Sequence, residues 1–465
     1  MTSLPSDFDA RGKHLLFVTG KLAAKLVHRV VTTAAEQFGF TFDIKVLGIS
    51  VAALMHAHWV VRKLAVNRTY DAVLFPGWCQ GDLNMVEQSV GSPCYLGPKD
   101  IQQLNQFLGG KSVDADLSNY NVEILAEINH APRLSLDQLI KQSDHYVESG
   151  ANLIDVGCIP GEPWDGVGDA VAALVQRGLR VSIDSFDKDE VCRAVDAGAE
   201  LVLSCSSQNI DWAVDVDVEW VVIPDDPQDL ASMWNTADQL KQAGRKFRVD
   251  PILEPVGFGF AASLARYFEV RRQDPDVPIL MGIGNVTELS DVDSAGVNFL
   301  LAAICEELSI NSVLTTEVIT WCQQSVREFD LSRQLAHYAI QHSTPPKRLS
   351  PQLVMLHDTH SRELGEETLM SLAQDIRDAN FRIFVERGDI HIMNRDGYWR
   401  GSDPFKLFDQ FSVAVSLDAS HAFYLGYELA KAMTALQLGK RYTQDESLHW
   451  GFLTVPEPKH RSQNG

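Results

Sequence analysis

Eight short apolar runs recur between about residues 121 and 335, and most of the gaps between them have helical spacing. Runs of four to eight apolar residues are typical of strands buried on both faces, whereas apolar residues three and four positions apart are typical of amphipathic helices. In chain order the runs are VEILAEIN, ANLIDVG, RVSIDS, ELVLSCS, EWVVIPD, KFRVDP, VPILMGIGN and NSVLTTE. Eight such strand–helix units predict a (β/α)8 TIM barrel, in which the unit after ELVLSCS fits least well because its gap is short.

Two different patterns flank the predicted barrel. Before it, LLFVTG and YDAVLFPGW are apolar runs that end in Gly or Pro, and LAAKLVHRVVTTAAEQFG between LLFVTG and FDIKVLGI has helical spacing, which predicts a small α/β domain. After it, the polar segment HSTPPKRLSPQ contains two consecutive prolines that cannot continue a helix. The sequence therefore predicts three domains, at residues 1–118, 119–341 and 342–465.

The predicted C-terminal domain is α+β. QLVMLHD, FRIFVERG and DIHIMNRDGYW read as strands, and the last of them contains the turn signal Asp396-Gly397. HAFYLGYELAKAMTALQLGK reads as an amphipathic helix that stops near Gly439.

Composition narrows the class of partner. The 465 residues include 62 acidic and 40 basic residues, a formal net charge of −22, which argues against binding to nucleic acid or to an anionic membrane. The seven cysteines form no CxxC pair, and neither a leader-like apolar stretch nor a segment of transmembrane length is apparent. We therefore expect a cytoplasmic protein with reduced thiols.

Polar residues follow the apolar part of most predicted barrel strands. Since the carboxyl ends of the strands carry the chemistry in such barrels, these residues are candidates for a site. They are Asn129, Asp155, Asp184, Ser204, Asp225, Asp250 and Asn285. Any one of them could simply cap a helix or start a turn. Together, several carboxylates at one mouth would repel one another, and a ligand with several N–H donors would relieve that repulsion.

The motifs NLIDVG, VSIDS and VDPILEPVGFGF resemble the pterin-binding barrel of dihydropteroate synthases and of pterin-dependent methyltransferases. They occur in the expected order and cover roughly half of the chain. The C-terminal stretch DASHAFYLGYELAKAMTALQLGKRYTQDESLHWG is similar to the tail of dihydropteroate synthase-like proteins associated with tetrahydromethanopterin biosynthesis.

This resemblance implies a pterin pocket. Asp250 would accept the 2-amino group and N3–H of the pterin, and Asp184 would bind the opposite side of the ring. Ser204 and Asn285 would line the pocket, and Gly257 would let the backbone approach the ring, although a tight turn explains that glycine equally well.

The resemblance also implies a reacting end. Asn129 and Asp155 would be the catalytic residues, and Asn129 would bind a Mg²⁺ ion that accompanies the diphosphate of the substrate. An oxygen ligand suits Mg²⁺.

The chain departs from the synthase pattern where the diphosphate should bind. The loop NHAPRLS keeps Asn129 but lacks the acid of the family motif, and Ser204 stands where the family has an asparagine. The seventh strand ends in GIGN, so Asn285 replaces a lysine, and VLTTEV on the eighth strand offers neither Arg nor His. Arg133, Lys188 or a residue of a flanking domain would then have to meet the anion.

The reading that follows is a dihydropteroate synthase-like transferase in tetrahydromethanopterin biosynthesis. It would join a 6-hydroxymethyl-dihydropterin diphosphate to an arylamine, which the flanking similarity suggests is 4-(β-D-ribofuranosyl)aminobenzene 5′-phosphate. The expected partners are these two substrates, and the sequence leaves a homodimer open.

Two alternatives remain. GIGN resembles the strand end of pterin-dependent methyltransferases, which act with a corrinoid partner, although DTHSRELG (358–365) misplaces the glycine of a cobalamin-binding motif by two residues. A non-catalytic pterin-binding or scaffold protein is the other alternative.

Overall fold

The computed structural model describes residues 4–5, 8–110, 115–356, 358, 364–415 and 417–457. The chain divides into two compact units, one of residues 1–116 with 342–345 and the other of residues 117–341 with 346–465. The predicted border between the barrel and a separate C-terminal domain is not tested by this division and stays a prediction. Among the described residues, no helix is both long and apolar enough to cross a bilayer.

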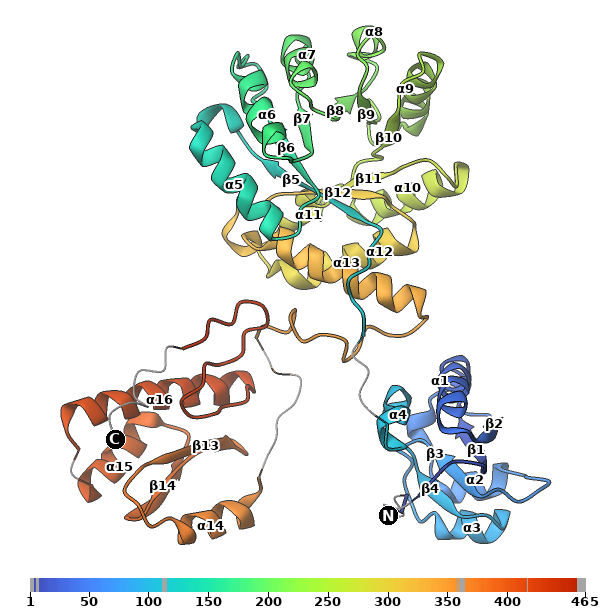
Figure 1. Ribbon diagram of the computed structural model, residues 1–465, viewed down its shortest axis with the longest axis vertical. Helices are drawn as coiled ribbons and strands as arrows, with labels where there is room; N and C mark the ends of the chain where they lie inside the picture. The colour runs from blue at the N-terminus through green and yellow to red at the C-terminus, as the bar shows by residue number, and fades with distance from the viewer. Residues whose placement is uncertain are drawn as a thin grey trace. The chain divides into compact units, whose positions relative to one another are not determined.

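The N-terminal unit is a four-stranded parallel sheet with the strand order β2-β1-β3-β4 (Figure 1). Two separate hydrophobic clusters form around this sheet, as a layered α/β domain requires. The strands are β1 (His14–Thr19), β2 (Thr41–Val46), β3 (Ala72–Phe75) and β4 (Cys94–Leu96). The helices are α1 (Ala24–Phe38), α2 (Ala57–Lys63), α3 (Asn84–Val90) and α4 (Leu104–Phe107).

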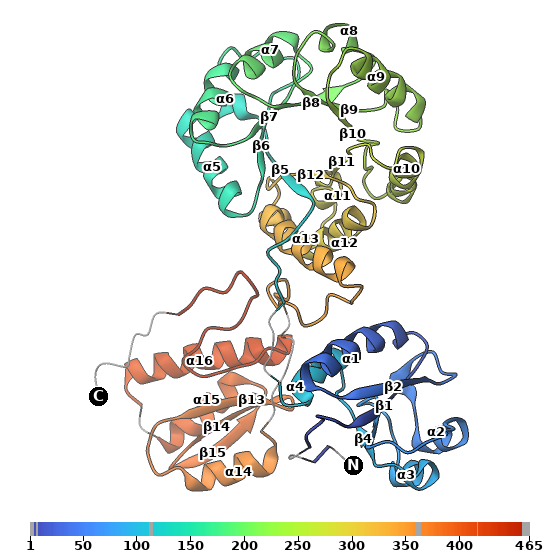
Figure 2. The same ribbon diagram turned by 45° about the vertical axis from the view of Figure 1, so that its right-hand side comes forward.

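The middle of the chain forms an eight-stranded parallel sheet that curls into a nearly closed barrel, which confirms the predicted fold class. Figure 2 shows helices α5 to α10 outside the ring of strands. The strands are β5 (Glu123–Ile128), β6 (Leu153–Gly157), β7 (Val181–Asp184), β8 (Leu201–Cys205), β9 (Glu219–Val222), β10 (Phe247–Val249), β11 (Leu280–Gly282) and β12 (Ser312–Thr315). Each lies within one of the eight apolar runs.

The barrel helices cover the outer face of this sheet and bury a large apolar cluster against it. They are α5 (Leu136–Glu148), α6 (Val167–Gln176), α7 (Lys188–Asp196), α8 (Ile210–Ala213), α9 (Leu230–Gln242), α10 (Phe260–Gln273), α11 (Gly284–Thr287), α12 (Ser294–Glu307) and α13 (Ser325–Gln341). The short α8 follows ELVLSCS, the run with the short gap.

The barrel has a seam between β10 and β11. The hydrogen-bonded order runs β10-β9-β8-β7-β6-β5-β12-β11, so these two strands stand at its ends. A single isolated bridge, Val249 with Ile279, connects the two edges, and Val249 N donates to Pro278 O at 2.9 Å. The site-bearing ends of both strands therefore flank the least hydrogen-bonded part of the barrel wall.

Side chains fill the barrel interior in layers, because alternate residues of a strand point to the same face. On β5 this places Glu123, Leu125 and Glu127 on one face. Leu125 belongs to a small apolar cluster with Leu153 and Leu280, separate from the cluster beneath the helices. The middle layer is thus apolar, and acidic residues of the same strand lie on either side of it.

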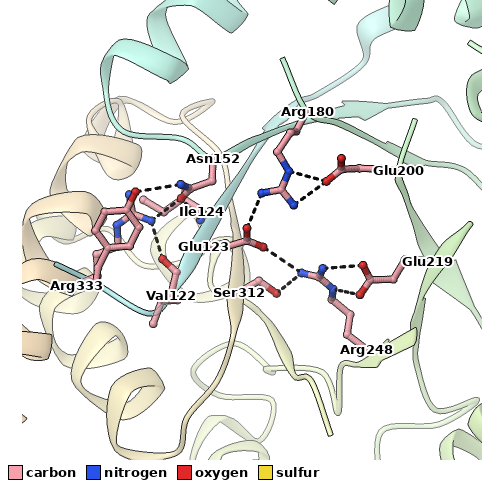
Figure 3. Close-up of polar contacts among 11 residues, drawn as sticks. Val122, Glu123, Ile124, Asn152, Arg180, Glu200, Glu219, Arg248, Ser312 and Arg333 are labelled. Atoms are coloured by element: carbon pink, nitrogen blue, oxygen red, sulfur yellow. Dashed lines mark hydrogen bonds and ion pairs between the residues drawn. The ribbon is translucent and has the colours of Figure 1, made fainter. Parts of the chain in front are cut away.

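An ion-pair network lies at the amino-terminal ends of the barrel strands (Figure 3). Glu123 accepts a hydrogen bond from Arg180 at 2.5 Å, and its other oxygen lies 3.8 Å from Arg248. Arg248, which is only 8% exposed, donates twice to Glu219, at 2.9 and 3.0 Å, and once to the hydroxyl of Ser312 at 2.9 Å. These contacts connect four strands at the bottom of the barrel, β5, β9, β10 and β12.

The C-terminal part contains a three-stranded antiparallel sheet, as predicted in outline. Its strands are β13 (Arg382–Glu386), β14 (Asp389–Asn394) and β15 (Gly397–Gly401), and its helices are α14 (Glu366–Asp375), α15 (Pro404–Ala414) and α16 (Ala419–Leu438). The expected helix ends at Gly439, which adopts the left-handed conformation of a C-terminal cap.

The strand prediction for QLVMLHD is wrong. Residues 352–356 form turns and irregular backbone, in which Val354 N donates to Pro351 O at 2.9 Å. An apolar run forms a strand only where another strand can pair with it, and no strand pairs with these residues in the described sheets. Most of the neighbouring DTHSRELG lies outside the described residues.

Candidate functional site

Three carboxylates meet at the upper end of the barrel interior. The register of β5 and β6 pairs Glu127 with Asp155, and the register of β6 and β7 pairs Gly157 with Asp184. One carboxylate oxygen from each of Glu127, Asp155 and Asp184 lies within 4.8 Å of the others. We call these three residues the acidic triad. Two of its members were predicted site residues.

The triad is electrostatically uncompensated. Burial raises the pKa of all three carboxyl groups above their ordinary values, and repulsion from the neighbouring acids raises the pKa of Glu127 and Asp155 further. In the part of the chain that the structure describes, no lysine or arginine forms an ion pair with any of the three. At an effective dielectric constant of about 20, each ionised pair at this separation would repel by roughly 3 to 4 kcal/mol.

Two buried oxygen atoms in this region have no hydrogen-bond donor among the described residues. Asp155 is fully buried; its Oδ1 accepts from the Ser182 hydroxyl at 2.6 Å, but its Oδ2 has no partner. Asn129, directly after β5, likewise has a buried Oδ1 without a partner. Buried polar atoms are normally satisfied, so these two oxygens indicate a missing donor or cation.

Gly157 lies next to both Glu127 of the triad and Asn129. A Cβ atom at this position would lie 2.8 Å from Glu127 Oε1 and 3.5 Å from the Cα of Asn129. A side chain here would therefore displace the Glu127 carboxylate. The glycine in LIDVG therefore leaves room for the Glu127 carboxylate next to Asn129.

A second group lies across the seam, around Asp250. Its Oδ1 accepts from the hydroxyl of Tyr267 at 2.6 Å and from the backbone N–H of Ile252 at 2.8 Å. Its Oδ2 has no protein donor among the described residues. Burial raises the pKa of Asp250 to about 6, although the hydrogen bonds from Tyr267 and Ile252 oppose that shift. One oxygen is thus anchored and the other remains for a ligand.

Asn285 belongs to the same group. Its Nδ2 donates to the backbone oxygen of Leu253 at 2.8 Å, which fixes the amide. A Cβ atom on Gly282 would lie 3.8 Å from both Asn285 Nδ2 and Asp250 Oδ2. The ends of β10 and β11 therefore bring these two predicted pterin-binding residues together beside a position without a side chain.

Contacts between described residues join neither Ser204 nor Gly257 to these two groups. The backbone oxygen of Ser204 accepts from Asn209 Nδ2 at 2.9 Å. Gly257 lies in an exposed turn with a φ of +92° and open space around it, so its backbone conformation alone favours glycine. A tight turn at GFGF is sufficient to explain Gly257, and the pterin-binding roles of Ser204 and Gly257 stay predictions.

The two candidate anion-binding residues are exposed. Arg133 follows Asn129 closely, and its side chain, 63% exposed, lies 3.6 Å from Glu162. Lys188 is the first residue of α7. Either side chain has conformational freedom to reach a ligand, since long exposed side chains are weakly held by surface ion pairs.

Glu127 is a site residue that was not predicted. It lies within β5, two residues before Asn129, whereas the predicted residue of this segment was Asn129 at its end. The alternation of Glu123, Leu125 and Glu127 was the available signal, because a period of two places all three on the barrel interior.

The fold and its mouth define an eight-stranded α/β barrel with an acidic site at the carboxyl ends of its strands. Comparison with known proteins gives a match of residues 13–99 to a family of unknown function, DUF6513, which covers the N-terminal sheet alone. An uncharacterized protein of Methanocaldococcus jannaschii is 28% identical, over 93% of this chain and 98% of its own length.

Among solved structures, the chain is similar to dihydropteroate synthases. The Yersinia pestis enzyme, solved with a pterin–sulfa conjugate, is 20% identical with a TM-score of 0.38, and the Vibrio fischeri enzyme is 19% identical with the same score. Each match covers 49% of this chain and 95% of the enzyme. These likenesses concern the fold, and the chemistry of this chain depends on the residues of the barrel mouth.

Proposed function

We propose that this protein is a pterin-binding transferase of the dihydropteroate synthase type. Its reaction would condense a 6-hydroxymethyl-dihydropterin diphosphate with an arylamine and release diphosphate. The observation that carries the proposal concerns Asp250: its Oδ1 accepts hydrogen bonds from Tyr267 and Ile252, while its Oδ2 accepts none from the described residues.

Asp250 suits the edge of a pterin ring. The 2-amino group and N3–H form a pair of adjacent donors, and a carboxylate is the side chain that accepts two donors side by side. Asp184, a member of the acidic triad at the same mouth, would accept hydrogen bonds from donors on the opposite side of the ring. Gly282 has no side chain to cover Asp250 Oδ2, which a Cβ atom there would approach to 3.8 Å.

The chemistry is a displacement at the exocyclic methylene carbon. The amine nitrogen forms a bond to that carbon, the C–O bond to the diphosphate breaks, and the diphosphate leaves with the electron pair. The amine then loses a proton to solvent. The carboxylates of the mouth would stabilise the positive charge that develops on the pterin, so no protein nucleophile is needed.

The residues present fit a Mg²⁺ ion at the reacting end. Asn129 offers a buried amide oxygen that has no donor among the described residues, and oxygen ligands suit this ion. A bound Mg²⁺ supplies charge neutralisation for the leaving diphosphate. Arg133 and Lys188 are the proposed cationic contacts of that diphosphate.

The arylamine proposed is 4-(β-D-ribofuranosyl)aminobenzene 5′-phosphate, in tetrahydromethanopterin biosynthesis. This finer assignment is supported by the C-terminal stretch DASHAFYLGYELAKAMTALQLGKRYTQDESLHWG alone, most of which forms α16.

Incubation with the dihydropterin diphosphate, Mg²⁺ and either 4-aminobenzoate or the phosphorylated amine tests the proposal. Mass spectrometry should identify a condensation product, with one diphosphate released per product. Tight pterin binding without product from either amine would instead identify a non-catalytic pterin-binding protein.

A pterin-dependent methyltransferase is the second candidate, and Asn285 favours it. An asparagine fixed beside the ring pocket can hydrogen-bond a ring nitrogen that carries a methyl group, whereas the synthase pattern has a lysine there. Methyl transfer from an N5-methylated tetrahydropterin to a corrinoid acceptor, in a protein that forms no condensation product, would establish this alternative.

Pterin affinity should depend on pH through Asp250. Only the ionised carboxylate accepts both ring donors, and the pKa of the free group is raised to about 6. Affinity should therefore be constant above about pH 7 and fall by about tenfold per unit below pH 6. Calorimetric titration between pH 5 and 8 measures this.

Tyr267→Phe provides the control for that profile. The Tyr267 hydroxyl lowers the pKa of Asp250, so its removal should move the fall in affinity to higher pH. A profile that is flat in both proteins would contradict the assignment of Asp250 to the ring.

A further inference from the structure

The acidic triad presents an excess of oxygen acceptors at one point. Glu127, Asp155 and Asp184 each contribute a carboxylate oxygen within 4.8 Å of the others. The Ser182 hydroxyl is the only side-chain donor to any of them among the described residues. Clustered acids alone have many explanations, including shared protons.

A second observation points to a ligand. Asp155 is 0% exposed, and its Oδ2 has no donor in the described part of the chain; its strand β6 pairs with β5 and β7, which carry the other two acids. This unsatisfied oxygen can only accept. What it lacks is a positive charge or a donor, which the neighbouring acids cannot supply when ionised.

We propose that the acidic triad is a binding site for one divalent cation, Mg²⁺ or Mn²⁺, in the protein free of substrate. Three carboxylate oxygens form the hard, oxygen-only ligand set that these ions prefer, and the ion retains water on its open side. Asp184 keeps its second oxygen for the pterin ring.

This site differs from the Mg²⁺ of the proposed reaction. That ion accompanies the diphosphate and uses Asn129, whereas the triad ion is held by protein ligands and requires neither pterin nor diphosphate. Glu127, which has no part in the proposed pterin contacts, is its diagnostic residue. The triad should therefore bind its ion whether or not the protein has transferase activity.

Mn²⁺ binding tests the proposal directly. The full-length protein is treated with a chelator, which is then removed, and the loss of the free Mn²⁺ electron paramagnetic resonance signal is measured without pterin. We expect one Mn²⁺ per chain, displaced by Mg²⁺. Glu127→Gln and Asp155→Asn should each weaken binding at least tenfold.

Asp165→Asn is the matched control. Asp165 lies on the loop after β6, its side chain is 97% exposed and it pairs with Arg193, so its removal should leave Mn²⁺ affinity unchanged. It reports any binding by surface carboxylates.

Thermal unfolding provides a second measurement of Mn²⁺ binding, which also detects a variant that folds poorly. Mn²⁺ should raise the melting temperature of the wild-type protein and of Asp165→Asn, but not that of Glu127→Gln. Equal Mn²⁺ binding by wild type and Glu127→Gln, or no stoichiometric binding by wild type at millimolar Mn²⁺, would overturn the site. Pterin titration of Glu127→Gln separates the two proposals, because pterin binding should persist in this variant.

Discussion

Asp250→Asn should weaken pterin binding by roughly 1.5 to 3 kcal/mol, which corresponds to a loss of about ten- to over a hundredfold in affinity. In the variant, Oδ1 can still accept from Tyr267 and from Ile252 N–H. The amide nitrogen would then replace Oδ2 and present a donor to the two donors of the ring. The fold should be retained, because the anchoring hydrogen bonds remain.

Calorimetric titration with a pterin measures this loss, and Asp225→Asn is its control. Asp225 also follows a barrel strand, but it is exposed, and its side chain accepts a hydrogen bond from Ser207 N–H at 3.1 Å. Its replacement should leave affinity unchanged. Equal pterin affinities of wild type and Asp250→Asn would contradict the assignment of the pterin ring pocket to the end of β10.

Arg248→Ala should lower the free energy of unfolding of the barrel by about 3 kcal/mol, the lower end of the range for breaking a buried ion pair. Arg248 is 8% exposed and satisfies both oxygens of Glu219 and the hydroxyl of Ser312 (Figure 3). Its removal leaves Glu219, whose side chain is only 25% exposed, without its cation.

Urea unfolding followed by circular dichroism measures the change, with Arg193→Ala as the comparison. Arg193 pairs with Asp165 on the surface, where the two side chains are 47% and 97% exposed, so its loss should cost less than about 1 kcal/mol. If both variants unfolded at the same urea concentration, the network at the bottom of the barrel would contribute no more than a surface pair.

The sequence was sufficient to predict the barrel because each strand is a compact apolar run. Asp155 and Asp184 were also predictable as candidates, since they interrupt those runs, although Asp155 lies in the middle of β6 and only Asp184 ends its strand. Their proximity to each other was expected from the fold alone, because parallel strands bring their carboxyl ends to one edge.

What the sequence could not provide was register. Glu127 faces Asp155 only because β5 and β6 pair at those residues, and a shift of one residue would turn Glu127 outward. The strand predicted at QLVMLHD failed for a related reason: local pattern does not determine whether a pairing partner exists. The glycine openings at Gly157 and Gly282 likewise depend on which side chains stand opposite.

Because of the seam, the barrel wall is held together less firmly between β10 and β11 than elsewhere. A single bridge, Val249 with Ile279, joins the two edges; Asp250 follows Val249 directly, and Asn285 lies in α11, just after β11. A ligand held by both residues would act as an added rung across this gap and tie the two edges together. We expect the ligand-free barrel to open locally at the seam before it opens elsewhere. Because a bound pterin would oppose this opening, backbone amides of β10 and β11 should exchange with deuterium more slowly once a pterin is bound.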